Sequence, residues 1–153
     1  MLSRRQLAAS QLTSMGFYGI LWEADPFAAI SKDTLISIQA NVTNEFGLLR
    51  EHLGLGLVPF RLGMFSTKDT SMHSEQYLSN SIFNFLDHDV VLASYRLLRE
   101  ADNVLTIKDY DTSTNIISGE FNVTFVITNN CDSLNNADTL FITNGAFQAL
   151  AVE

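Results

Sequence analysis

The sequence predicts an all-β fold, either an antiparallel β-sandwich or a partly closed barrel, with one or two short helices. Phe, Ile, Val, Leu and Thr recur in short runs bounded by Asn, Asp, Ser and Gly, which is typical of strands separated by turns. Several runs are joined directly by turns, which indicates antiparallel pairing. The 153 residues are 46% hydrophobic and 17% charged, a composition typical of one globular domain.

The N-terminal part of the chain contains two predicted strands. We expect residues 1–15 to be an exposed segment, natural or introduced by cloning, and residues 16–153 to form a single β domain. Gly16–Trp22 is predicted to be a short first strand that Asp25-Pro26 ends with a turn. Leu35–Val42 alternates apolar and polar residues, as a half-buried strand does.

The middle of the chain is where we expect helix. Asn44–Leu53 has apolar residues at helical spacing and Asn44 as an N-cap, which favours a short helix, although a strand is an open alternative. Leu57–Phe65 is predicted to be a strand that includes Pro59. Ser74–Leu86 fits a helix and a strand equally well, and both interpretations stay open.

The last third of the chain has the clearest pattern. We expect strands over Val90–Leu98, Val104–Asp109, Phe121–Val126 and Thr139–Phe147, with Gln148–Val152 closing the chain. Two glycine positions indicate special backbone geometry. Gly119 is typical of a bulge or a close backbone approach, and the pair Asn144-Gly145 of a tight turn or bulge.

Four segments of this chain resemble one known family. They are Gly16–Trp22, Leu105–Asp111, Asn115–Phe121 and Thr139–Phe147. Together they are similar to the strands of small cell-envelope lipoprotein domains of unknown function from Bacteroidota. The resemblance is specific over roughly the last 45 residues and looser at the opening strand. It implies an exported, mostly β accessory domain, and it carries no catalytic residues over to this chain.

The turn after Leu105–Asp111 has the spacing of a calcium loop. Asp109, Asp111 and Asn115 stand at positions 1, 3 and 7 of an EF-hand count, with Glu120 at position 12. Thr114 occupies position 6, where that loop needs Gly. A strand after Asn115 would also carry Glu120 roughly 15 Å away at about 3.3 Å per residue. We therefore favour an ordinary polar hairpin turn, with Asp109, Asp111 and Asn115 as the weaker calcium candidates.

Other chemical signals are absent or weak. Asp87-His88-Asp89 places two carboxylates beside an imidazole, and we expect it to be a surface turn. Cys131 lies in a polar run and is expected to be a loop thiol without chemistry. There is no G-x-S-x-G nucleophile motif, no zinc-ligand spacing and no complete glycine-rich nucleotide loop. We therefore expect a protein that is not an enzyme and that needs no cofactor.

Three aromatic residues are candidates for a ligand platform. Tyr18, Trp22 and Tyr110 could stack on the faces of a sugar if they are exposed, and packing in the core or at its rim is the alternative. The 11 Phe residues are assigned to the core.

Charge limits the partners of this chain. The formal net charge is −8 and the pI about 4.7, which disfavours nucleic acid and anionic membranes. No apolar run reaches the roughly 18 residues of a membrane span. We expect an exported cell-envelope or surface domain, periplasmic or associated with the outer membrane, that binds a protein partner. A small-ligand or glycan-binding β module is the alternative.

Overall fold

The structure is a computed structural model that describes residues 5–12, 20–31, 35–69, 77–131 and 136–152. Its strands are β1 (Arg5–Leu12), β2 (Ile20–Ser31), β3 (Leu35–Thr43), β4 (Leu49–Pro59), β5 (Gly63–Ser66), β6 (Ile82–Asp87), β7 (Val90–Leu97), β8 (Val104–Asp111), β9 (Ile116–Asn130) and β10 (Thr139–Val152). The predicted all-β fold is confirmed. The described residues form no helix, so the expected short helices were wrong. Accordingly, none of the described segments is a helix able to cross a membrane.

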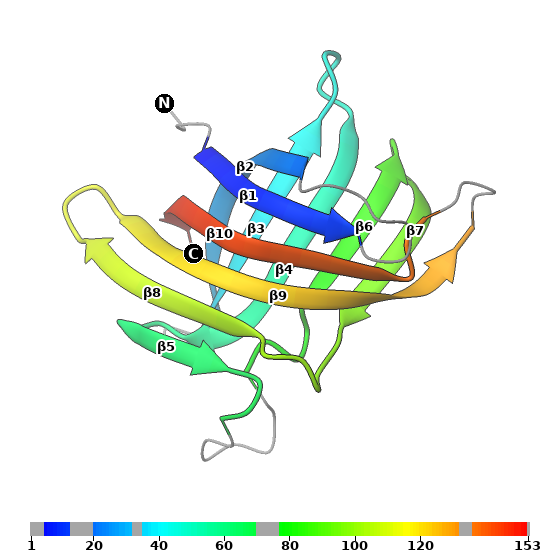
Figure 1. Cartoon of the computed structure of the whole chain (residues 1–153). Helices are drawn as coiled ribbons and strands as arrows, with labels where there is room; N and C mark the ends of the chain where they lie inside the picture. Colours follow the sequence, from blue (N-terminus) through cyan, green and yellow to red (C-terminus); the bar gives the residue numbers. More distant parts are fainter. Residues whose placement is uncertain (1–4, 13–19, 32–34, 70–76, 132–135, 153) are drawn as a thin grey trace.

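The strands form one sheet that folds over itself into two facing layers (Figure 1). Its order is β1-β10-β2-β3-β4-β6-β7-β9-β8-β5. Strand β10 also pairs with β9 along its other edge, so it links both ends of the run from β2 to β9. The pairings are antiparallel except for three residue pairs between Leu150–Val152 and Phe27–Ala29. This arrangement is the predicted sandwich or partly closed barrel.

One hydrophobic core lies between the layers. Its buried side chains come from all strands from β3 to β10 and from the turn before β6. They are Ile36, Ile38, Ala40, Leu53, Leu55, Val58, Phe65, Leu78, Phe83, Ala93, Tyr95, Leu97, Leu105, Ile107, Ile117, Phe121, Val123, Phe125, Leu140, Ile142, Phe147 and Ala149. No buried side-chain nitrogen or oxygen in the described part of the chain lacks a hydrogen-bond partner, so the burial of these polar groups is compensated.

The helix expected over Asn44–Leu53 is replaced by a turn and the start of β4. The Asn44 Oδ1 accepts hydrogen bonds from the backbone N–H of Phe46 at 3.0 Å and of Leu48 at 2.9 Å. Gly47 has a φ of 76°, a conformation that ends a helix. Asn44 therefore closes a hairpin turn, and the side chain of Phe46, assigned to the core, is 76% exposed.

The N-terminal strands differ from the expected boundaries. Strand β2 continues through Pro26, which pairs with Ala40, so Asp25-Pro26 does not end it. On the other side of β2, the pairs with β1 end at Ala24 and those with β10 begin at Phe27. A proline is tolerated there because that side has no partner at residue 26. Part of the segment 1–15, expected outside the domain, is β1, which pairs with β2 and β10.

The structure decides between helix and strand in the middle of the chain. The strand expected over Leu57–Phe65 is interrupted, because β4 ends at Pro59 and β5 begins at Gly63. Within Ser74–Leu86 the described part is a turn at 77–80 followed by β6, and residues 74–76 lie outside the described residues. The strands expected in the last third are confirmed, and β9 and β10 extend further than their patterns predicted.

Two glycines make room for two phenylalanine rings across the β9–β10 ladder. Gly119 pairs with Phe147, and Gly145 pairs with Phe121. A Cβ at Gly119 would lie 2.7 Å from Phe147 Cζ, and one at Gly145 would lie 2.5 Å from Phe121 Cζ. The rings thus cover the opposite glycines, an arrangement that protects the exposed backbone of glycine in a strand. The register shift at Asn144 confirms the predicted bulge.

Candidate functional site

A pocket lies between β8 and the segment that joins β4 to β5. Its volume is about 290 Å³. The lining side chains are Phe60, Arg61, Leu62, Ile107, Asp109 and Tyr110. Most of the wall is apolar, with one cation and one anion, and ligand sites commonly combine apolar walls with a few polar groups.

A β-bulge in β8 turns Tyr110 toward the core side of the sheet. Ile107 pairs with Gly119, whereas Asp109 pairs with the preceding residue, Ser118. Lys108 is therefore the extra residue, and the in-out alternation shifts by one after it. As a result Tyr110 packs against the hydrophobic core, while Asp109 is exposed at the pocket.

The aromatic part of the pocket is held rigidly. The Phe60 and Tyr110 rings pack edge to face, with centroids 4.9 Å apart and planes at 64°, a favourable aromatic geometry. The Tyr110 hydroxyl donates to Asn115 Oδ1. In turn, Asn115 Nδ2 donates to the Ala151 carbonyl at 3.1 Å. These contacts preorganise the Tyr110 ring before any ligand binds.

Opposite charges stand on the pocket wall. The Arg61 guanidinium lies 5.6 Å from the centroid of Phe65, within the range of a cation–π contact. Asp109 supplies a carboxylate on the β8 side. A wall with one donor cation and one acceptor anion suits a ligand that has both acceptors and donors and little net charge.

Large apolar side chains are exposed beside the pocket. Leu62 is 57% exposed and Met64, on β5, is 66% exposed. Strand β5 stands at the end of the strand order, with β8 as its neighbour (Figure 1). We call the pocket residues together with Met64 the β5 edge site. Sequence reasoning missed it except for Asp109 and Tyr110, although Phe60 and Leu62 stand between Pro59 and Gly63, where a turn exposes apolar side chains.

Two of the calcium candidates, Asp111 and Asn115, flank a hydrogen-bonded turn, whereas Asp109 lies within β8 at the pocket. Asp111 Oδ1 accepts from the Ser113 hydroxyl at 2.6 Å and from the Ser113 N–H at 2.8 Å. Hydrogen bonds from Ser113 and then Thr114 lower the pKa of the Asp111 carboxyl to about 2. Glu120 is ion-paired with Lys108. Among the described residues, no group of three or more His, Cys, Asp or Glu side chains is placed to hold a metal ion.

The three ligand-platform candidates are not brought together by any described contact. Tyr110 lines the pocket. Trp22 is in β2, where its backbone pairs with Leu7, but its side chain lies outside the description. Tyr18 lies outside the described residues altogether.

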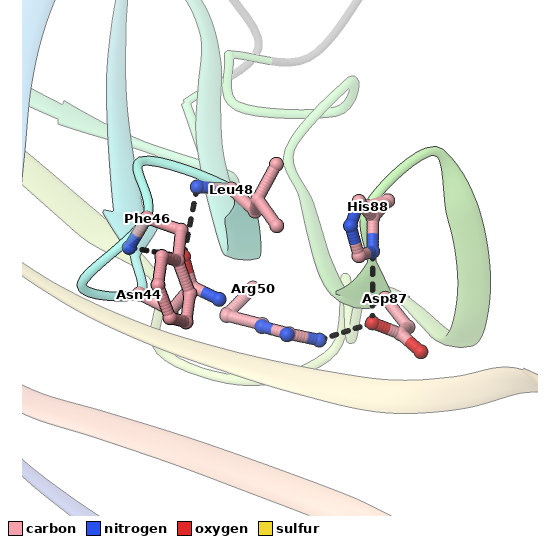
Figure 2. A network of polar contacts seen from close by, with 6 residues as sticks. All are labelled: Asn44, Phe46, Leu48, Arg50, Asp87 and His88. Carbon is pink, nitrogen blue, oxygen red and sulfur yellow. Dashed lines mark hydrogen bonds and ion pairs between the residues drawn. The ribbon is translucent and has the colours of Figure 1, made fainter.

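A second exposed feature joins the β3–β4 and β6–β7 turns (Figure 2). Arg50 forms an ion pair with Asp87, and His88 Nδ1 lies 3.2 Å from the same Asp87 oxygen. The hydrogen bond from His88, followed by the Arg50 contact, lowers the pKa of Asp87. His88 has a φ of 59° at the tip of the β6–β7 hairpin, which confirms the expected surface turn at Asp87-His88-Asp89. This network fixes two neighbouring turns.

Comparisons were made with protein-family models, with curated proteins and with solved structures. None of them matches this chain. The resemblance to the Bacteroidota envelope domains therefore stays a prediction, and the pocket and the edge strand carry the functional argument.

Proposed function

We propose that this chain is a non-catalytic accessory domain of the cell envelope or surface that binds a protein partner at the β5 edge site. One observation carries the proposal. Leu62 and Met64 are 57% and 66% exposed at an apolar pocket, outside the cluster of buried core residues. Exposed apolar side chains that gather at one place are typical of protein-binding surfaces.

The expected gain from covering these side chains is large enough to matter. Burying a Leu or Met side chain completely contributes about 1.5–3 kcal/mol. Since Leu62 and Met64 are already partly covered, a partner that buries the remainder gains about 2–3 kcal/mol from the pair. That gain corresponds to about a hundredfold in affinity.

The envelope location and the absence of catalysis rest on other support. The family resemblance implies an exported accessory domain. The acidic chain, with a net charge of −8, disfavours nucleic acid and anionic membranes as partners. The sequence contains no catalytic motif, and the adjacent side chains of Asp87 and His88 are exposed and fix a turn.

A co-purification experiment with matched surface variants tests the proposal. The tagged full chain is expressed in the cells that make it, and bound proteins are quantified by mass spectrometry. The double variant Leu62→Ser/Met64→Ser should lose its partner, whereas Phe46→Ser, at a different exposed apolar side chain, should retain it. Circular dichroism confirms that both variants are folded. Equal recovery of the same partners by both variants would overturn the proposal.

A small ligand or glycan is the second candidate occupant. The favouring observation is the edge-to-face pair of Phe60 and Tyr110 in a pocket of about 290 Å³ that also has Arg61 and Asp109 on its wall. This volume is near the lower end of ligand sites, so it suits one sugar ring. Binding to a glycan array that Tyr110→Ala abolishes and Phe46→Ser preserves would support this function. An array signal that Tyr110→Ala leaves unchanged would exclude this site.

A further inference from the structure

The direction of the backbone groups along β5 follows from the contacts of Ser66. Its N–H donates to Asp69 Oδ2 at 3.2 Å, and its C=O accepts from the Asp69 N–H at 3.1 Å. Both groups therefore face away from β8. In an antiparallel strand the two groups of one residue face the same side, and successive residues alternate. The N–H and C=O of Met64 thus also face away from β8.

The next residues along the chain agree with this assignment. The Thr67 N–H donates to the Asn103 carbonyl, on the β8 side, at 3.3 Å. Residues of odd number in this segment therefore face β8, as Phe65 does opposite Leu105. Of the described strands, none pairs with the outer edge of β5. Asp69 covers this edge at Ser66, and Met64 is left as the residue that can pair with an added strand.

We propose that an extended segment of a protein partner adds to β5 as a further strand and inserts one apolar side chain into the pocket. This inference rests on the proposed function and specifies its partner. The added backbone exchanges hydrogen bonds with the N–H and C=O of Met64. Leu62, which lines the pocket, lies in the bend two residues before Met64, at most about 7 Å away along the chain, so one short segment reaches both.

The chemistry of the site selects an extended peptide. A peptide backbone supplies a C=O for Arg61 and an N–H for Asp109, the two charged groups on the pocket wall. The pocket of about 290 Å³ takes a single aliphatic or aromatic side chain. The net charge of −8 favours a neutral or basic segment over an acidic one, and it disfavours a second copy of this chain.

Selection from a peptide library tests the inference directly. Random linear peptides about 12 residues long are displayed and selected on the full chain. The best binder is synthesised with an N-methyl group at each position in turn. We expect N-methylation to lower the affinity about tenfold at the position whose N–H donates to the Met64 carbonyl, and to have little effect at the positions on either side, because only alternate N–H groups face β5. A flat profile, or equal losses at neighbouring positions, would overturn strand addition, and so would the failure to select any peptide.

A variant of the protein tests the same hydrogen bond from the other side. Met64→Pro removes an N–H that faces away from β8, so the ladder with β8 is preserved. We expect Met64→Pro to bind the selected peptide at least about tenfold more weakly than Met64→Gln, which keeps the N–H. Equal affinity of the two variants would contradict the inference. If Met64→Pro does not fold, hydrogen exchange of the wild-type Met64 amide decides, since the peptide must slow it.

The outcomes separate this inference from the proposed function. If the double variant loses the cellular partner while the N-methyl profile is flat, the proposed binding at the β5 edge site is kept and strand addition is rejected. If the double variant retains every partner, the proposed function fails as well. A dimer detected by light scattering and abolished by Met64→Pro would replace the peptide with a second copy of the chain and overturn the inference.

Discussion

Replacing Asn103 with Ala should destabilise the fold more than any nearby surface change. Strand β9 pairs with β8 up to Asn122 and with β7 from Phe125, so Thr124 lies in a gap between the two ladders. The fully buried Asn103 fills this gap, because its Oδ1 accepts from the Thr124 N–H at 2.8 Å. The side chain of Asn103 therefore acts as the missing strand partner.

The magnitude follows from the three hydrogen bonds of the Asn103 side chain. Besides the bond to Thr124, its Nδ2 donates to the Leu98 carbonyl at 2.7 Å and to the Ala101 carbonyl at 3.3 Å. Each bond contributes about 1 kcal/mol, and an unsatisfied N–H costs about 1–3 kcal/mol. We expect Asn103→Ala to lower the free energy of unfolding by about 3 kcal/mol and the Tm by about 10 °C.

Urea unfolding followed by circular dichroism measures this loss. The variant Asn103→Asp keeps the acceptor for Thr124 but places a buried carboxylate against the Leu98 and Ala101 carbonyls, so it should be at least as destabilising as Asn103→Ala. Asp102→Ala is the control, because this neighbouring side chain is exposed and its ion pair with Lys68 contributes little. A loss below about 1 kcal/mol for Asn103→Ala, or an equal loss for Asp102→Ala, would refute the reasoning.

Four further changes have defined outcomes. Gly119→Ala should abolish the folded state or destabilise it by more than about 3 kcal/mol, since its Cβ would overlap the Thr106 carbonyl. A Cβ at Gly47 would meet no atom within 4 Å, but the φ of this residue is 76°. Gly47→Ala should therefore lower the free energy of unfolding by about 1–2 kcal/mol, measured by the same urea unfolding. Equal losses of stability for Gly119→Ala and Gly47→Ala would contradict the packing argument. Asp111→Asn tests the carboxyl whose pKa the turn lowers to about 2. A lowered pKa stabilises the fold above the unfolded pKa near 3.9, and this contribution disappears as the pH falls toward 2. The stability of the wild type should therefore fall more steeply than that of Asp111→Asn between pH 5 and pH 2, and parallel curves would exclude the effect. Tyr95→Phe removes a buried hydrogen bond of 2.9 Å to a backbone carbonyl and should lower the unfolding free energy by about 1 kcal/mol; an unchanged Tm would show that water replaces it.

The sequence predicted strands best where alternation and turn residues agree. Ile36, Ile38 and Ala40 alternate with polar residues and are buried as expected. The segment from Asn44 to Leu53 misled because Phe46, Leu49 and Leu53 are also at helical spacing. The hydrogen bonds of Asn44 and the φ of Gly47 outweighed that pattern, because they close a turn before any helix can form.

The candidate site could be predicted only in part. Tyr110 was singled out as an aromatic candidate, and Asp109 as a carboxylate in a metal loop. The sequence does not reveal that a bulge at Lys108 directs them to one pocket, since a bulge depends on the register with β9. Phe60 and Arg61 come from a segment some 50 residues earlier in the chain, and no local pattern predicts that they meet Tyr110.

By itself, the sequence determined the all-β class, the last strands and the polar turn at Asp111, because these depend on side-chain alternation and on local hydrogen bonds. The tertiary structure decided which strands pair and in which register. It placed β5 at the end of the strand order with Met64 facing outward, and it set Asn103 in the gap between two ladders. Both depend on contacts between residues far apart in the chain, whose register no local sequence pattern contains.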